Sequence, residues 1–469
     1  MGTRSRMLRP VALAVSAALV IAACGSDDDS SDDASVSDDG GDSSDAEGGG
    51  GGDSDLAGES VEIFGAYSGD EADLMRETLQ PLIDATGIDV EYVDSPAFDT
   101  EITTRVEGGN LPDIAFFPQP GLLLDIADQT DATPVGEYLD ISALEASLIP
   151  GFLDAATADD GNVYGFPVRM AVKSAMWRPL PAFDDGGYTV PTDDVELASL
   201  EDQILADGGT PWCLGMESGP ATGWVGTDWV EEYMLRLHGP DVYDQWVTNE
   251  LPFDSPEVRA AFEKFEELWD KDGNVVGGTA GVLGLSFGDV TADLFTEPAN
   301  CYLHRQGNFI TGFFPTEVQD ELDDNVAVSY FPPVEGGFDG NPVLAGGDLA
   351  LLIDDNPAAR AVMEFLATDT YGAEWASAGG WLSPHVGFDD SLYPTQVERD
   401  LFQIGAQADV LRFDASDLMP GPVGTGSFWT GMVDWIGGQR SLDEVLDTKA
   451  YIDMPARRDR QKGTTCPRS

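Results

Sequence analysis

Basic residues are scarce in this chain. Its 469 residues include 23 Lys and Arg against 86 Asp and Glu, which gives a formal net charge of -63. Lysine occurs at only five positions, which are Lys173, Lys264, Lys271, Lys449 and Lys462. So acidic a chain repels nucleic acid and anionic lipid headgroups, and both are excluded as partners. The acidic surface suits a salty medium, in which counterions screen the self-repulsion.

Histidine and cysteine are also rare, with 3 and 4 copies. Metal-ligand clusters are thereby limited to carboxylates, and we expect no metal and no other cofactor. The sequence has no HExxH, no CxxC and no glycine loop ending in Gly-Lys-Ser/Thr, so zinc-enzyme and ATPase classes lack support. A G-x-S-x-G match lies at 284–288, but no clear strand precedes it, so we do not expect a nucleophile elbow.

Long apolar runs are missing beyond the N-terminus. Residues 11–23 are apolar, follow three arginines and end in small residues before Cys24, which is the layout of a secretory signal over 1–23. Downstream, no stretch of about 18 apolar residues could anchor the protein. The sequence Ile-Ala-Ala-Cys at 21–24 resembles a lipoprotein lipobox, which implies a lipid on Cys24; ordinary cleavage with a free Cys24 is the alternative.

Residues 24–58 predict a disordered acidic tether. From 25 to 58 there are twelve acidic and no basic residues, and so polar a segment cannot bury enough apolar surface to fold. The rest of the chain, about 410 residues, exceeds a single ordinary core, so two domains are expected. Residues 456–469 form a polar C-terminal tail.

The folded part begins with an α/β pattern. Apolar runs predict strands at 61–66, 88–93 and 113–117, and amphipathic runs predict helices at 70–85 and 98–107, the first kinked or shortened by Pro81. This alternation points to a parallel α/β sheet. In such sheets ligands bind beyond the carboxyl ends of the strands.

Two extended runs predict crossings between the expected domains. The first is 163–177, after the turn signal Asp160-Gly161. The second is 342–353, an apolar strand interrupted at 346–348. Between and after them, Ser255-Pro256 and Asn356-Pro357 start two amphipathic helices.

The stretch 211–229, PWCLGMESGPATGWVGTDW, contains three of the ten tryptophans. Flat apolar rings interleaved with short polar side chains suit a hydroxyl-rich planar ligand, so we interpret it as a ligand platform. The alternative is a core-forming loop and helix, because large aromatic residues more often pack than bind.

Over roughly 60–445, eight motifs in order resemble the extracellular solute-binding lipoproteins of bacterial ABC importers, in the sugar-binding group and its α-glucoside type. The motifs are VEIFGAYSGDEA, GGNLPDIAFFPQPG, DGNVYGFPVRMAVKSAMW, PWCLGMESGPATGWVGTDWVEE, CYLHRQGNF, PVLAGGDLAL, AGGWLSPH and RFDASDLMPGPVGTGSFWTGMVDW. This resemblance implies an α/β, two-lobed periplasmic-binding-protein-like fold with hinge strands and a ligand cleft. The lobes would be 60–168 with 345–385, and 169–344 with 386–455.

The implied function is capture of a carbohydrate, either an α-glucoside or an oligosaccharide, by closure of the two lobes. The protein would then deliver the sugar to the membrane permease subunits of the importer. Its interaction with the ATPase subunit would be indirect. The protein would be a monomer, held by its lipid anchor on the outer side of the cell membrane, and not an enzyme. The alternative is a secreted carbohydrate-active hydrolase, which needs only two carboxylates.

Several candidate ligand residues follow the predicted strands of the first lobe. Tyr67, Asp70 and Glu71 follow the first strand, where the family places ligand contacts. A helix cap by Asp70, with Glu71 in the first turn, explains the same residues. Gln119, after the third strand, could bond a sugar hydroxyl, although a satisfied turn residue is the alternative.

The first crossing carries two cations. Arg169 and Lys173 lie two pleats apart and should face one side of an extended strand. Charged donors make strong hydrogen bonds even to neutral sugars, and ion pairs with nearby carboxylates are the alternative.

Other candidates belong to the second half of the chain. Within 211–229 they are Glu217, Trp224 and Asp228, while Trp212 and Trp229 could equally be core. Further candidates with packing or capping alternatives are Arg305, Asp348 in the glycine-lined break and Trp381 as a lid ring.

Cys213 and Cys301 begin two of the matching motifs. In an oxidising exterior we expect a disulfide between them, the rival being two separate buried thiols. Cys466 has no evident partner.

Overall fold

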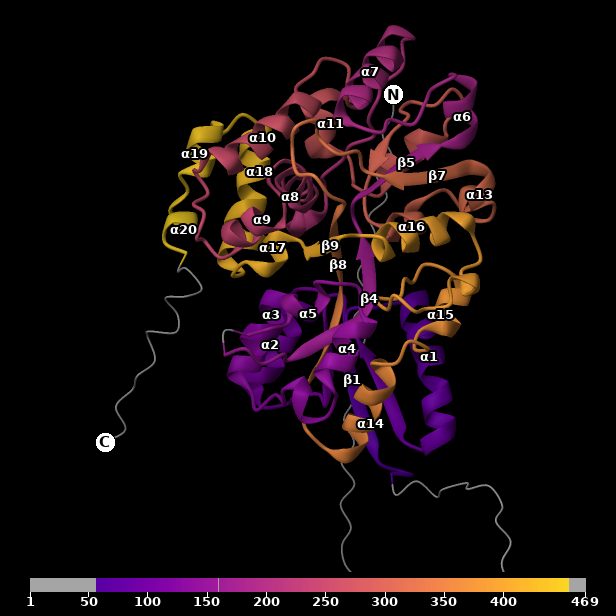
Figure 1. The fold of residues 1–469 in the computed structure, drawn as a ribbon, viewed down its shortest axis with the longest axis vertical. Coiled ribbons are helices and arrows are strands. Elements are labelled where there is room, and N and C mark those ends of the chain that lie inside the picture. Colours follow the sequence, from indigo (N-terminus) through magenta and orange to yellow (C-terminus); the bar gives the residue numbers. More distant parts are fainter. Residues whose placement is uncertain (1–55, 159, 455–469) are drawn as a thin grey trace, which may run out of the picture. The chain divides into compact units, whose positions relative to one another are not determined.

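The computed structural model describes residues 56–158 and 160–454, which form two β-sheets surrounded by helices (Figure 1). The six-stranded sheet has the order β2-β1-β3-β8-β4, with β9 beside β8. Its strands are β1 Ser60–Gly65, β2 Asp89–Asp94, β3 Ile114–Phe117, β4 Gly165–Val172, β8 Pro342–Leu352 and β9 Val410–Phe413. The three-stranded sheet, β6-β5-β7, contains β5 Ala175–Pro179, β6 His304–Arg305 and β7 Val326–Tyr330.

The predictions for the signal peptide, the lipid on Cys24, nearly all of the acidic tether and the C-terminal tail lie outside the described residues. Within them, none of the helices has both the length and the apolar character needed to cross a membrane.

The first strands and helices match the predicted pattern closely. Helix α1 buries Met75, Leu79 and Leu82 on the expected face. The expected shortening of the helix at Pro81 is wrong, because α1 continues from Asp70 to Thr86. Pro81 and the residue one turn before it, Glu77, are both exposed. Water can therefore satisfy the carbonyl that the missing N–H leaves free, and the helix persists.

The six-stranded sheet is mixed rather than purely parallel, which corrects the sequence prediction. Strands β2 and β3 pair parallel with β1, whereas β8 pairs antiparallel with both β3 and β4. Local patterns could not show this, because β8 comes from a distant part of the chain and lies between two strands of the first segment.

Both predicted crossings join the two sheets. Strand β4 leaves the large sheet, and after Lys173 and Ser174 the chain enters β5 of the small one. The backbone N–H groups of Lys173 and Ser174 both donate to the Leu344 carbonyl of β8, so the crossings lie side by side. The predicted break in β8 is wrong, because the strand runs through 346–348. Gly347 has φ 151°, and a Cβ there would lie 2.2 Å from the Arg169 carbonyl oxygen.

Helices cover both sheets (Figure 1). Around the large sheet they are α1 Asp70–Thr86, α2 Phe98–Gly108, α3 Pro120–Gln129, α4 Ile141–Ser147, α5 Phe152–Ala155, α14 Pro357–Leu366 and α15 Ala373–Ala378. The others are α6 Leu180–Asp185, α7 Asp194–Ala206, α8 Trp224–His238, α9 Pro240–Val247, α10 Pro256–Trp269, α11 Gly278–Gly284, α12 Thr316–Gln319, α13 Leu322–Asn325, α16 Gln396–Ala406, α17 Ala415–Leu418, α18 Trp429–Ile436, α19 Leu442–Leu446 and α20 Lys449–Ile452. A π-helical segment, η6, spans Pro422–Phe428.

Two large apolar cores result. One surrounds the six-stranded sheet; the other lies among α7, α8, α10 and α18. The predicted helix after Ser255 is confirmed as α10, whose Val258, Phe262 and Phe265 are fully buried. Within residues 386–413, which the prediction places in the second lobe, Leu401 and Leu411 belong to the core cluster around the large sheet, while α16 also contacts β7 of the small sheet.

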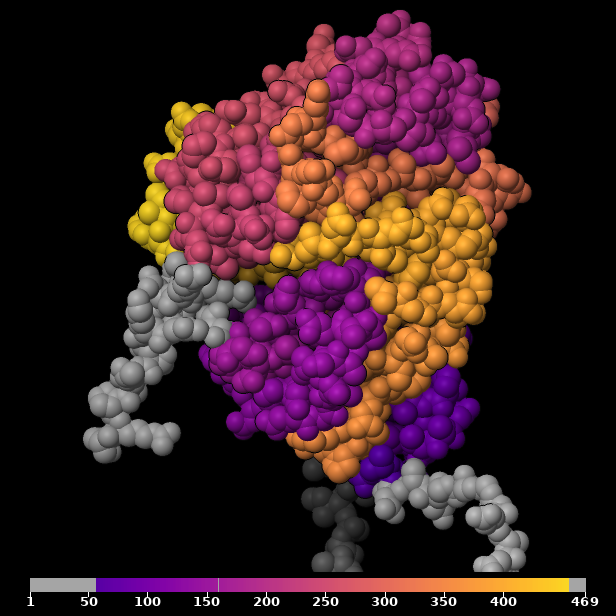
Figure 2. Space-filling view, viewed as in Figure 1, coloured from indigo at the N-terminus to yellow at the C-terminus, as the bar shows by residue number. Residues whose placement is uncertain are grey.

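The segment after β9 returns to the N-terminal part of the chain. Helix α17 contacts α3, and in Figure 2 the orange-yellow C-terminal segment lies directly against the purple one. This contact brings the two parts of the chain together at the candidate site.

Candidate functional site

A cavity of about 170 Å³ lies between α2 and α3 on one side and α17 and η6 on the other. Six of its nine lining residues carry oxygen atoms in their side chains. The lining residues are Asp99, Gln119, Leu122, Asp125, Ser416, Asp417, Met419, Gly421 and Thr425. Acceptor oxygens from both walls suit a ligand that donates several hydroxyl protons.

Gln119 is the predicted ligand residue that lines this cavity. It occupies the N-cap position of α3, where its side chain makes no capping hydrogen bond. Its Oε1 atom is buried and has no hydrogen-bond partner in the structure. A buried amide oxygen without a donor is unfavourable by about 1–3 kcal/mol, so the Gln119 side chain has an unmet need for a donor.

Asp417 faces Gln119 from the opposite wall. Burial raises the pKa of Asp417 to about 6, with Lys173 opposing the rise and Asp228 and Asp99 adding to it. Burial also raises the pKa of Asp99. Two acids from different segments thus line one cavity, and a hydroxyl-bearing ligand between them would donate hydrogen bonds to both.

Arg169 and Lys173 extend to different partners. The Arg169 guanidinium bonds Glu71 at 2.8 Å, donates to the Gly380 carbonyl at 3.3 Å and stacks over Tyr67. Lys173 forms ion pairs with Asp228 and Asp414 and lies 5.3 Å from the Trp224 ring centroid. The ion-pair alternative for both cations is therefore what the structure contains.

The Lys173 ammonium lies in a cluster of buried acids. Asp228 is 2% exposed, Asp414 is 1% exposed, and Glu231 on the next turn of α8 is fully buried. Burial raises the pKa of Asp228 and of Asp414, and Lys173 opposes both shifts. Burial also raises the pKa of Glu231. Asp417 adjoins this cluster, because its N–H donates to the Asp414 carbonyl.

The stretch 211–229 contains both buried core residues and residues that are partly or fully exposed. Trp212 and Trp229 are buried and pack edge to face, which is the core role considered for them. Trp224, the first residue of α8, is half-buried, and its Nε1 donates to Ser218 at 2.8 Å. Glu217 is exposed and accepts from the Gly219 N–H, so it closes its own loop.

Arg305 belongs to a buried ion network. It is 2% exposed and donates to Glu232 at 2.8 Å, while Arg236 binds the other Glu232 oxygen at 2.7 Å. Burial acts to raise the pKa of Glu232, but the two guanidinium groups hold it below its usual value. Arg305 lines none of the cavities described here.

The candidates near β1 are divided between packing and surface positions. Tyr67 is buried against Trp375, and Asp348 lies opposite Arg169 in the sheet, where burial raises its pKa. Asp70 is exposed in the first turn of α1, whose N-cap is Gly69, so the predicted Asp cap is wrong.

The predicted lid role of Trp381 is contradicted by its burial. The ring is 1% exposed and packs between Tyr371 and Phe388 in the core of the large sheet. The glycines before it suggested an open loop, but tertiary packing covers the ring.

The expected disulfide between Cys213 and Cys301 is present, with a Cα–Cα distance of 5.5 Å. Next to it, His304 is buried, with Nδ1 2.8 Å from the Cys213 carbonyl oxygen. This bridge ties the start of 211–229 to the segment that enters β6.

Five acids of the site escaped sequence reasoning: Asp99, Asp125, Glu231, Asp414 and Asp417. Asp414 had a usable signal, because it follows β9 directly, in the way that candidate residues follow other strands. The others had none, since one acid among 86 is not distinctive.

Larger cavities occur elsewhere in the described residues. One of about 350 Å³ lies against β7 and α16, and one of about 240 Å³ lies between α5 and α9. Neither contains a predicted ligand residue. The cavity beside Gln119 therefore remains the best candidate.

Comparison with protein families matches residues 72–373 to the model described as bacterial extracellular solute-binding protein. Among curated proteins, the chain is 43% identical over 390 residues to the osmoprotective compounds-binding protein GgtB of Synechocystis, covering 83% of this chain and 91% of that one. It is 39% identical over 407 residues to the alpha-glucosides-binding periplasmic protein AglE of Rhizobium meliloti, covering 85% and 88%.

Solved structures share the fold at low sequence identity. A chitin oligosaccharide binding protein aligns with a TM-score of 0.66 at 18% identity, covering 84% of this chain and 97% of that one. The cyclic alpha-maltosyl-1,6-maltose binding protein of Arthrobacter globiformis aligns with a TM-score of 0.62 at 18% identity, covering 83% and 96%.

Proposed function

Because the chain belongs to the bacterial extracellular solute-binding proteins, we propose that it captures a neutral carbohydrate in the Gln119 cavity for an ABC importer. The ligand is an α-glucoside, an oligosaccharide or a related polyol. The names of its two long relatives support this choice, since one binds alpha-glucosides and the other osmoprotective compounds.

The unpartnered Gln119 Oε1 in an acid-lined cavity is the observation that carries the proposal. Both walls must supply contacts at once, and they do so only when the segments carrying α3 and α17 lie together. A ligand that binds both walls therefore stabilises the closed form. That form delivers the sugar to the permease subunits, and no covalent chemistry is needed.

Titration with maltose, trehalose, sucrose, polyols and amino acids, followed by tryptophan fluorescence, tests the proposal. We expect at least one sugar or polyol to bind with a dissociation constant below about 1 mM. Binding of another solute class, with no response to any carbohydrate, would overturn it.

Two variants assign the site. Gln119→Ala and Asp417→Asn should each weaken binding at least about tenfold, the effect of one lost hydrogen bond of about 1.4 kcal/mol. The matched control is Gln403→Ala in the 350 Å³ cavity, which should bind normally. Equal losses in Gln119→Ala and Gln403→Ala would place the ligand elsewhere.

The hydrolase alternative predicts consumption of the ligand. A binding protein leaves the sugar intact, so prolonged incubation with the bound sugar should release no reducing ends. Release that Asp417→Asn abolishes would favour the hydrolase instead.

We also propose a lipid anchor on Cys24 that holds a monomer at the outer face of the membrane. The lipobox resemblance supports it, and several acyl chains give stable anchoring. Labelling with radioactive palmitate should mark the wild type, and Cys24→Ala should release unlabelled protein into the medium.

A further inference from the structure

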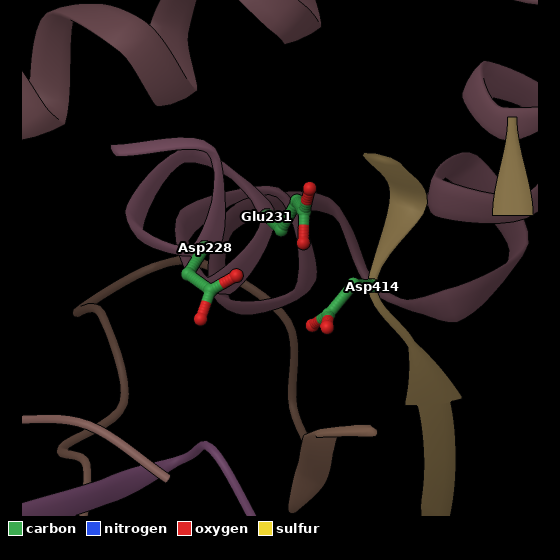
Figure 3. A group of neighbouring side chains, drawn as sticks. All are labelled: Asp228, Glu231 and Asp414. Carbon is green, nitrogen blue, oxygen red and sulfur yellow. The ribbon is translucent and has the colours of Figure 1, made fainter. Parts of the chain in front are cut away.

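Three carboxylates from two separate segments converge in the interior (Figure 3). Asp228 and Glu231 extend from α8, and Asp414 follows β9. One oxygen from each lies within 4.8 Å of the others, and all three side chains are at least 98% buried. In Figure 3 the three groups point toward one shared space.

Two of these acids, Glu231 and Asp414, have one oxygen without a hydrogen-bond donor. Asp228 Oδ1 and Asp414 Oδ2 accept from Lys173, and Glu231 Oε1 accepts from the Ser416 N–H. Asp228 Oδ2 lies 3.2 Å from the Lys173 ammonium, whereas Glu231 Oε2 and Asp414 Oδ1 have no hydrogen-bond partner. Buried charged oxygens without partners are among the most unfavourable groups in a protein interior.

Glu232, which follows Glu231 in α8, is a buried acid whose hydrogen-bond donors are all side chains. Glu232 is also fully buried, but two arginines and Ser174 occupy its oxygens. Glu231 has only one backbone N–H. The contrast indicates that a partner other than a side chain completes Glu231.

The charge of the cluster specifies that partner. When ionised, Asp228, Glu231 and Asp414 carry three negative charges, and Lys173 forms ion pairs with two of them, Asp228 and Asp414. The formal net charge is −2. Glu232 and Asp417 add two acids, while Arg236 and Arg305 add two cations, so the wider network has the same net charge. One divalent cation neutralises it.

We propose that Asp228, Glu231 and Asp414 bind a calcium ion. The donors are all carboxylate oxygens, which are the ligands of hard cations. Calcium binds oxygen at 2.3–2.6 Å, so ligands on opposite sides lie roughly 5 Å apart; magnesium at 2.0–2.1 Å needs a tighter set. Lys173 contacts both oxygens of Asp228 and the Oδ2 atom of Asp414, and so orients the two carboxylates.

The calcium ion would join α8 to the segment that carries the ligand cavity. Asp414 precedes α17, and Ser416 and Asp417 of that helix line the cavity. This proposal does not depend on the identity of the sugar, and the site can be tested without any sugar.

Thermal unfolding of the full-length protein with EDTA or with calcium chloride is the first test. At roughly 100 times its dissociation constant, calcium should raise the wild-type midpoint by about 3–5 °C. Glu231→Gln keeps an acceptor for the Ser416 N–H but removes a charge, so it should be at least as stable as the wild type in EDTA and lose the calcium response. The control Asp241→Asn, at an exposed acid on α9, should respond as the wild type does.

Terbium luminescence on the wild type gives an independent measurement. Trp224, whose ring lies beside Lys173, should sensitise terbium at this site, and calcium should displace the signal. Absence of both the calcium shift and the terbium signal would overturn the proposal. The buried carboxyl groups would then be neutralised by protonation. A full calcium response in Glu231→Gln would overturn it as well, since the cation would then bind elsewhere.

Discussion

Arg169 and Lys173 are four residues apart along the first crossing, yet they bind acids of different segments. Arg169 pairs with Glu71 of α1, and Lys173 pairs with Asp228 of α8 and Asp414 after β9. Both cations are at most 9% exposed. Ion pairs to separate segments thus hold the crossing at both Arg169 and Lys173.

Removal of the two cations should have unequal effects. In EDTA, Lys173→Met leaves Asp228 and Asp414 buried without their cation and should destabilise the fold by about 3–5 kcal/mol. Arg169→Met should have a smaller effect, because Glu71 is half-exposed and can be solvated. Urea unfolding measures both. Glu71→Gln is the matched control, with an expected change below about 1 kcal/mol. Equal losses in the two methionine variants would contradict this assignment.

Stability should fall in acid because of His304. Burial, with Arg305 adding to it, lowers the pKa of His304 to about 4, although the Cys213 carbonyl acts against the shift. In the unfolded chain His304 is protonated near pH 6.5, whereas in the folded protein it stays neutral to a lower pH. This contribution to stability is therefore complete above about pH 6.5 and is lost, by up to about 1.4 kcal/mol per pH unit, as the pH falls toward 4.

His304→Asn should lack this part of the pH dependence, since it keeps a donor for the Cys213 carbonyl without titrating. Denaturant unfolding of both proteins between pH 4 and pH 7 isolates the effect, because the other acids are common to both. Parallel curves would show that His304 does not titrate on unfolding.

The disulfide should contribute substantially to stability. Its cysteines are 88 residues apart, and closure of such a loop stabilises by about 4–5 kcal/mol as an upper figure. The double variant Cys213→Ala and Cys301→Ala should unfold at lower denaturant, and dithiothreitol should have no further effect on it. Equal midpoints for the wild type with and without reductant would contradict the prediction.

Salt should stabilise the fold. With a formal net charge of -63, self-repulsion is strong, and it is screened as the Debye length falls from about 10 Å at 0.1 M to about 3 Å at 1 M salt. The thermal midpoint should rise steadily with sodium chloride. Glycerol at equal osmolality serves as the uncharged control, and a midpoint that is flat in salt would refute the screening argument.

Local patterns predicted much of the fold. The alternation of apolar runs placed β1, α1, β2, α2 and β3 almost to the residue, because each is specified by its own periodicity. The same holds for α10 after Ser255. The antiparallel position of β8 between β3 and β4 was not predicted, because strand order depends on contacts between distant segments.

The candidate site was less predictable for the same reason. Gln119 could be named because it follows a strand that local sequence reveals. The pairing of Asp228 with Asp414 through Lys173 depends on three distant segments, and nothing near any of them marks it. The prediction of a lid role for Trp381 was wrong for another reason. The glycines before it suggested an exposed loop, but tertiary packing buries the ring.

The place of β8 between β3 and β4 also sets the order in which the protein is assembled. Both neighbours are synthesised well before it, so during synthesis they have no partner on their facing edges. At usual rates of translation that interval lasts tens of seconds. Unpaired strand edges invite aggregation, so the nascent chain needs a chaperone, or passage across the membrane unfolded, until residue 352 has been added.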